Sequence, residues 1–177
     1  MENKYIVPNI RGFKDFVSLE EYANSTYKYF FNETYLTIDQ LLENNRSLIL
    51  GEPGMGKTRL LKETTLRAIG TGSKAIYVDL KSVKDKNLIK HILDAKDSIS
   101  KDSENTTIFG SNDFQFSKEI EDAEYVLCLD ALDEVLPANR SSVLDGVREI
   151  IDQYPRTSIL CSCRKNYYQI FPMSTWI

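Results

Sequence analysis

Histidine is almost missing from this chain of 177 residues, and acidic residues outnumber basic ones. A zinc site needs about four ligands, and a single histidine with three cysteines offers no visible set. Lysine and arginine total 22 against 26 aspartates and glutamates, so the formal net charge of −4 provides no positive field for a phosphate backbone. We therefore expect no zinc site, and nucleic acid is not a favoured partner.

Long hydrophobic runs and targeting signals are missing as well. No apolar stretch approaches the roughly 20 residues that span a bilayer. The N-terminus, MENKYIVPNIRGF, is neither a charged-then-apolar secretory signal nor an Arg- and Ser-rich transit peptide. The cysteines, Cys128, Cys161 and Cys163, lie in apolar strand-like runs and are expected to be reduced and buried. These features predict a cytoplasmic protein with no membrane partner.

The chain does contain a phosphate-binding pattern, which we call the phosphate loop. Residues 51–58 read GEPGMGKT and fit G-x-x-x-x-G-K-[ST] without a mismatch. Glycines let backbone N–H groups approach triphosphate oxygens, and a following helix adds unpaired N–H groups and a positive dipole end. Lys57 is expected to reach the outer phosphates and Thr58 to hold Mg²⁺. The residues predicted to bind nucleotide are Gly51, Glu52, Pro53, Gly54, Met55, Gly56, Lys57, Thr58 and Arg59.

The residues around the phosphate loop agree with this interpretation. RSLIL at 46–50 predicts a buried strand that runs into the loop. After the loop, residues 60–68 supply an apolar helical face that the glycines at 70 and 72 end. Strand, loop and helix follow in the order that the motif requires, which argues against a glycine-rich surface turn beside a stray lysine. For Arg59, approach to a phosphate and extension into solvent both stay open.

Strand and helix patterns alternate along the rest of the chain. Further strands are predicted at 74–80, 125–129 and 157–163, and helices at 85–95 and at 139–153, the last capped by Asn139. This alternation predicts a three-layer α/β fold of the P-loop NTPase type, with a mostly parallel sheet flanked by helices. Residues 96–117 are polar and are interpreted as a long loop or a partly ordered insertion.

The first 45 residues are predicted to form two helices that lead into the core. Ser18 with Glu21, and Thr37 with Gln40, each resemble a capping box at the start of a helix. The chain is of a length that fits one domain with a single core. We therefore divide it into a helical lead-in at 1–45 and a nucleotide-binding core at 46–177.

Carboxylates follow the strand predicted at 125–129. Asp130, Asp133 and Glu134 emerge where a parallel strand ends, the edge at which open α/β sheets bind ligands. Asp130 is placed to hold the Mg²⁺ shell together with Thr58. Asp133 and Glu134 could reach a water aligned on the terminal phosphate, although an acidic turn that caps the next segment is the alternative. Asp79 also ends an apolar run, but no acids follow it, so we favour Asp130.

Arginines are the remaining candidates. Arg164 follows the last predicted strand, where a guanidinium could sense or stabilise the terminal phosphate. On the residues alone, an ordinary surface arginine is an open alternative. Arg140, Arg148 and Arg156 are candidates for contacts in an assembly, which the sequence does not sort from solvated charges.

Three segments together resemble a NACHT domain, a branch of the STAND class of signal-transduction ATPases related to AAA+ proteins. They are LILGEPGMGKT at 48–58, VLCLDALDE at 126–134 and ILCSCR at 159–164. The second is the most specific, because a small residue after the metal aspartate, then an apolar residue and a second acidic pair, is the family's variant of the metal-binding strand. The resemblance covers residues 37–164.

The resemblance implies a switch that binds ATP or ADP with Mg²⁺, hydrolyses slowly and serves innate immune or antiviral defence. It implies that Glu134 with Asp133 activates water, while Lys57 and Arg164 neutralise phosphate charge. It also implies that strand 157–163 lies between the strand before the phosphate loop and strand 125–129. The implied partners are the nucleotide, further copies through the full-length protein, and an unknown trigger that we expect to be a protein.

The chain departs from the family after Arg164. Such proteins continue into a helical lid, a winged helix and a sensor region of repeats, none of which the sequence contains. The apolar tail at 171–177 resembles an element cut short, so we expect a fragment of a larger protein. Two alternatives stay open. One is a nucleotide-binding scaffold without useful hydrolysis, and the other is an AAA+ motor, against which the acidic charge balance and the DALDE spelling stand.

Overall fold

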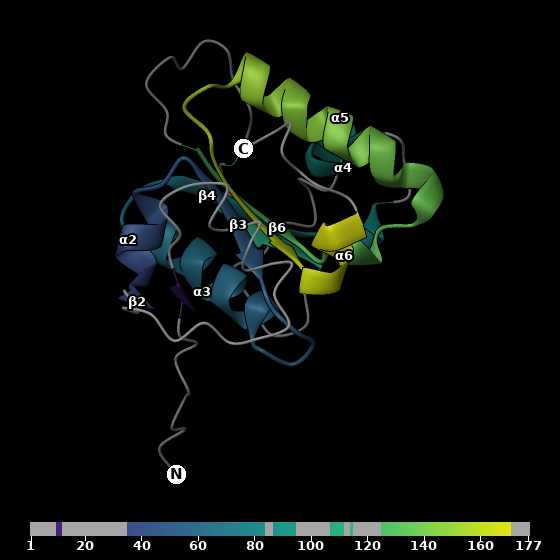
Figure 1. Cartoon of the computed structure of the whole chain (residues 1–177). Helices are drawn as coiled ribbons and strands as arrows, with labels where there is room; N and C mark the ends of the chain where they lie inside the picture. The colour runs from purple at the N-terminus through teal and green to yellow at the C-terminus, as the bar shows by residue number, and fades with distance from the viewer. Residues whose placement is uncertain are drawn as a thin grey trace.

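A five-stranded sheet forms the centre of the computed structural model, which describes residues 10–11, 35–83, 87–94, 107–111, 114 and 125–170 (Figure 1). Its strands, in spatial order, are β3 (Arg46–Leu50), β7 (Ser158–Cys163), β6 (Tyr125–Asp130), β4 (Lys74–Asp79) and β5 (Ile108–Gly110). The first four are parallel, and β5 runs antiparallel to β4 at the edge. The fold is therefore α/β with a mostly parallel sheet, as predicted.

The position of β7 confirms the expected strand order. It lies between β3 and β6, with Leu50 beside Cys163 on one side and Leu129 beside Cys161 on the other. Segments that are far apart in the sequence thus end at a common edge, because the carboxyl ends of parallel strands point the same way. We call this the carboxyl edge of the sheet.

Strand β5 lies within residues 96–117, which were interpreted as a long loop or a partly ordered insertion, and no strand was predicted there. Its two apolar residues stand among polar ones, too short a run to be recognised as a strand. Pairing with β4 supplies what the local pattern lacks, since Phe109 lies beside Tyr77 and the Ser111 hydroxyl accepts from the Ala75 N–H at 2.9 Å. Much of the remaining segment lies outside the described residues.

Helices cover both faces of the sheet (Figure 1). On one face lie α2 (Ile38–Leu42) and α3 (Lys57–Gly70), and on the other lie α4 (Leu88–Asp94) and α5 (Pro137–Gln153). Two 3-10 turns, η1 (Leu80–Ser82) and η3 (Leu132–Glu134), follow β4 and β6, and α6 (Lys165–Ile170) follows β7. No helix in the described part of the chain is long and apolar enough to cross a bilayer.

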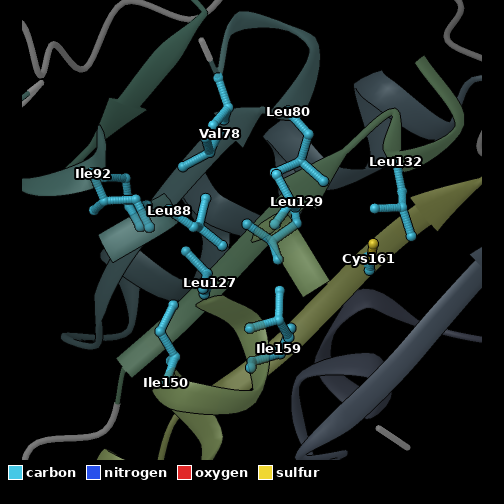
Figure 2. Close-up of a cluster of buried hydrophobic side chains, with 14 of the residues drawn as sticks. Val78, Leu80, Leu88, Ile92, Leu127, Leu129, Leu132, Ile150, Ile159 and Cys161 are labelled. Carbon is cyan, nitrogen blue, oxygen red and sulfur yellow. The ribbon is translucent and has the colours of Figure 1, made fainter. Parts of the chain in front are cut away.

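Successive residues of the central strands alternate between two hydrophobic cores. Leu127 and Ile159 belong to the core beneath α4 and α5, which we call the α5-side core (Figure 2). Ile76 of β4 belongs to the same core. The neighbouring residues Tyr77 and Cys128 belong to the core beneath α2 and α3, the α3-side core. The same alternation directs the last residue of β6, Asp130, to the α3 side, the side of the helix that follows the phosphate loop.

The start of α5 differs from the prediction. The helix begins at Pro137, two residues before the expected cap at Asn139, and its N-cap is Leu136. Proline fits the first helical turn because its φ is preset to a helical value. The N–H that proline lacks would have no intrahelical partner at this position in any residue. Asn139 lies inside the helix and its Nδ2 donates to the Val83 carbonyl at 3.3 Å. The sequence signal for the start was the proline.

The lead-in contains strand as well as helix. The capping box of Thr37 and Gln40 is confirmed, with Gln40 N–H donating to Thr37 Oγ1 at 3.2 Å and Thr37 N–H donating to Gln40 Oε1 at 2.9 Å. A small antiparallel pair, β1 (Ile10–Arg11) with β2 (Tyr35–Leu36), was not predicted. The capping box of Ser18 and Glu21 and the tail at 171–177 lie outside the described residues.

Candidate functional site

The phosphate loop leaves β3 and turns into α3 through two left-handed glycines. Gly54 has a φ of 78° and Gly56 a φ of 82°, a region that side-chain-bearing residues rarely occupy. Gly56 is also the N-cap of α3, so no side chain in the described part of the chain caps the helix. The first N–H groups of α3 therefore remain available as donors at the positive end of the helix dipole.

Lys57, the first residue of α3, folds back over the loop. Its ammonium group donates to the carbonyls of Gly51 at 2.8 Å and Glu52 at 3.0 Å. Thr58 is exposed beside it. Arg59 forms an ion pair with Glu63 at 2.8 Å, one turn further along α3. The Lys57 ammonium group and the exposed Thr58 hydroxyl therefore both lie where the phosphate loop meets α3.

The carboxylate of Asp130 is buried and held from both sides. Only 3% of the residue is exposed. The Tyr77 hydroxyl, on β4, donates to Oδ2 at 2.9 Å, and the Ser162 hydroxyl, on β7, donates to Oδ1. Ser162 in turn accepts from the Ala131 N–H at 2.9 Å. Both strands that neighbour β6 therefore contribute a donor to the same carboxylate.

After Asp130 the backbone turns sharply. Ala131 has a left-handed φ of 59°, a conformation that costs a non-glycine residue on the order of 1 kcal/mol. Leu132 compensates by burying its side chain in the α5-side core (Figure 2). The turn brings Asp133 and Glu134 to the carboxyl edge, and with Asp130 they form what we call the acidic tip.

Arg164, at the end of β7, contacts both outer acids of this tip. Its Nε lies 2.8 Å from Asp133 Oδ2 and its terminal nitrogen lies 2.8 Å from Glu134 Oε1. Its backbone N–H also donates to Asp133 Oδ1 at 3.0 Å. The Asp133 side chain is 7% exposed, against 40% for Glu134. Arg164 is therefore part of a charged cluster rather than an isolated surface arginine.

The phosphate loop and the acidic tip lie at the same edge, with Arg164 between them. They follow β3 and β6, and the intervening strand β7 ends at Cys163 and is followed by Arg164. Burial raises the pKa of the Cys163 thiol to about 12, with the charge of Asp133 raising it further and that of Lys57 opposing. The shared edge itself follows from the strand pairing, since β7 lies between β3 and β6 in the sheet.

The three cysteines are unpaired and buried, as predicted. Burial also raises the pKa of Cys128 to about 12. Thiols with such pKa values stay protonated near neutral pH and are poor nucleophiles. They act as small apolar side chains of the sheet.

Asp79, the alternative metal aspartate, is used locally. Its Oδ1 accepts from the Lys81 N–H at 3.1 Å and its Oδ2 lies 3.4 Å from Lys81 Nζ. These contacts cap η1. The arginines considered for assembly also have partners within the chain, since Arg140 donates to the Val135 carbonyl at 3.0 Å and Arg148 pairs with Asp145 at 2.9 Å.

Thr58 and Asp130 are the residues that could hold a cation at this edge. Their oxygens suit Mg²⁺, which prefers hard ligands and keeps several waters. Within the described ranges, no three His, Cys, Asp or Glu side chains come together as a metal-binding group. A Mg²⁺ site with one hydroxyl and one carboxylate does not need such a group, because phosphate oxygens and water complete the coordination shell of the metal.

Sequence reasoning missed Tyr77 and Ser162. Period-two alternation was the available signal, since Tyr77 precedes Asp79 by two residues and so shares its face of the sheet. No sequence pattern indicated that both hydroxyls bond to Asp130.

Comparison of the chain with protein-family models, with curated proteins and with solved structures found no match.

Proposed function

We propose that this chain is the ATP- or ADP-binding core of a NACHT-type signalling ATPase, with Mg²⁺ as its cofactor and slow hydrolysis. The order of the strand ends supports this proposal most strongly. The phosphate loop after β3, Arg164 after β7 and the acidic tip after β6 come from three adjacent strands. Phosphoryl transfer needs these three kinds of group around one phosphate chain.

Phosphate binding would use the loop and the start of α3. Backbone N–H groups of residues 51–58 would surround the phosphates at the positive end of the helix dipole. Lys57 now donates to two neutral carbonyls. A phosphate oxygen is a stronger acceptor for its ammonium group, because it carries negative charge and a carbonyl oxygen does not. We therefore expect Lys57 to exchange partners when nucleotide binds.

Asp130 and Thr58 would hold the metal. Bound Mg²⁺ would neutralise phosphate charge. An ionised carboxylate has about four lone-pair positions, so the hydroxyls of Tyr77 and Ser162 leave acceptor capacity for a metal-bound water or the metal itself. The site fits Mg²⁺ through its oxygen ligands.

Glu134 and Asp133 would orient the attacking water, and Arg164 would contact the terminal phosphate. Arg164 is engaged with both carboxylates, so it would have to release at least one of them. Glu134 is the more exposed partner and is easier to separate, because water can solvate its charge. Movement of Arg164 to a phosphate would thus free Glu134 for its water.

The test is titration of the purified protein with ATP and ADP in the presence of Mg²⁺. Lys57→Ala should weaken binding about tenfold or more, because a charge-assisted bond contributes roughly 1.5–3 kcal/mol. Lys90→Ala is the matched control, since Lys90 is exposed on α4, on the opposite face of the sheet. A protein that ignores every purine nucleotide, or equal losses in both variants, would contradict the proposal.

The second candidate is a nucleotide-binding interaction scaffold without significant hydrolysis. It is favoured by the double engagement of Arg164, which would leave no free base if the pairs persisted. Phosphate release and self-association, each measured with ATP and with ADP, separate the two. A switch should release phosphate, and its association state should differ between ATP and ADP. Such nucleotide-controlled assembly is what we propose for a protein that acts in innate immune or antiviral defence and responds to a protein trigger.

A further inference from the structure

Tyr77 is a buried tyrosine whose hydroxyl meets a buried carboxylate. It is 2% exposed and donates to Asp130 Oδ2 at 2.9 Å from the neighbouring strand. Opposite it, Ser162 donates to Oδ1 from the strand on the other side of β6. The carboxylate is therefore fixed between two hydroxyls rather than free to rotate at the end of its strand.

The ring of Tyr77 is itself held in place. It stacks on Phe109 with centroids 5.1 Å apart and planes 23° apart. Lys62 Nζ lies 5.1 Å from the Tyr77 centroid, a cation–π distance. Lys62 belongs to α3, the helix that begins at Lys57. Lys62 Nζ also lies 6.0 Å from the Phe109 centroid, so the lysine and both rings form one cluster that holds the Tyr77 ring with its hydroxyl at Asp130.

The hydroxyl can act only as a donor to this carboxylate. An ionised carboxylate can only accept hydrogen bonds, so the phenol supplies the proton of this bond. A buried carboxylate without hydrogen-bond donors would be strongly disfavoured in its charged form. The donor thus offsets part of the cost of burying this carboxylate.

We propose that Tyr77 is a positioning residue for the Mg²⁺ site, whose hydroxyl, opposite Ser162, holds the Asp130 carboxylate in the orientation that binds the metal shell. This inference rests on the proposed function. Partners that orient metal ligands typically affect metal affinity by about 10- to 100-fold. The hydroxyl of Tyr77 should therefore matter for Mg²⁺ and not for the phosphate loop.

Tyr77→Phe is the variant of choice, since it keeps the ring and its stacking and removes one oxygen. ATP binding is measured by calorimetry across a Mg²⁺ titration and again in EDTA. The Mg²⁺ concentration at half-effect should rise about tenfold, while binding in EDTA stays unchanged. Tyr125→Phe is the matched control, because Tyr125 is equally buried but lies in the α5-side core. Its Mg²⁺ dependence should match the wild type.

Two results would overturn the inference. One is an unchanged Mg²⁺ dependence in Tyr77→Phe; the other is a loss of ATP binding that is equal with and without Mg²⁺, which indicates a packing role. Should Tyr77→Phe fail to fold, Ser162→Ala removes the opposite donor, and an unchanged Mg²⁺ dependence there overturns the inference as well. Failure of the proposed function looks different, because the wild-type protein would then bind no ATP in either condition.

Discussion

Asp79 and Asp130 end neighbouring strands and lie side by side in register, yet their carboxylates have different surroundings. Asp79 bonds to Lys81, two residues further along the chain, and caps a turn. Asp130 bonds to hydroxyls from two other strands. The two strand ends look alike in sequence, since each is an apolar run that ends in an aspartate. They differ in how far along the chain the hydrogen-bond partners of the aspartate lie.

The difference follows from the residues after each aspartate. Behind Asp79, a nearby lysine neutralises the charge and the chain continues into η1. Behind Asp130, Ala131 takes a left-handed conformation and no basic residue follows at once, so the carboxylate stays at the strand end. Asp79 is thus satisfied by a residue close in sequence, whereas Asp130 is held by donors from two distant strands.

The largest expected effect comes from exchanging each aspartate for its amide. Asp130→Asn should weaken Mg²⁺-dependent ATP binding on the order of 100-fold, because loss of a metal ligand costs at least as much as loss of the partners that orient it. Asp79→Asn should change it by no more than a few-fold. Calorimetry across a Mg²⁺ titration measures both. The reverse order would assign the metal to Asp79.

Glu134→Gln removes one charge from the acidic tip and leaves Asp130 in place. It therefore separates the expected role of Glu134 in turnover from that of Asp130 in Mg²⁺ binding. We expect ATP binding to persist and turnover to fall by about 100-fold or more, since a positioned general base contributes about 10²- to 10⁴-fold. Phosphate release under single-turnover conditions is the measurement. Glu149→Gln, an exposed carboxylate on α5, is the control and should leave turnover unchanged. Unchanged turnover in Glu134→Gln would remove Glu134 from the mechanism.

Gly146→Ala tests whether Mg²⁺ dependence responds only to changes at the carboxyl edge or to any loss of packing. A Cβ at Gly146 would lie 2.8 Å from Leu88 Cβ, so α4 would have to shift. We expect a net loss of up to about 2 kcal/mol in unfolding free energy, because overpacking of about 1–3 kcal/mol exceeds the gain in helix propensity. Denaturant unfolding measures it, and Mg²⁺ dependence should stay normal.

Gly70→Ala is the matched substitution at the end of α3. A Cβ there meets nothing within 4 Å, so the stability should stay constant or rise by up to about 1 kcal/mol. Equal changes in stability at both glycines would show that the close approach of α4 and α5 is not what decides the outcome.

The smallest effect is expected for Lys81→Ala, which breaks the ion pair of the Asp79 strand end. Lys81 is 60% exposed, so the loss in unfolding free energy should stay below about 1 kcal/mol. Salt should reduce the difference between variant and wild type, since it screens exposed charges. A loss of several kcal/mol would contradict the expectation that this exposed ion pair contributes little to stability.

Much of the fold was predictable because its signals are local. The bounds of β3 were predicted to the residue, although the strand is half-buried rather than buried. The capping box of Thr37 and Gln40 was also predicted, and the structure shows both of its hydrogen bonds. Strand β5 was not predictable, since three residues carry too little periodicity and their burial comes from β4. The start of α5 was misplaced because an asparagine was favoured over the proline that occupies the first turn.

The sequence by itself determined the phosphate loop, because a motif of eight adjacent residues specifies its own turns through glycine φ angles. Only the tertiary structure decided what faces the acidic tip. The bonds from Tyr77 and Ser162 to Asp130 join residues 53 and 32 positions apart, and the bond from Arg164 to Glu134 joins residues 30 apart. Such contacts depend on which strands are neighbours in the sheet; the resemblance implied the place of β7, but the residues that meet across neighbouring strands are fixed only by the folded sheet.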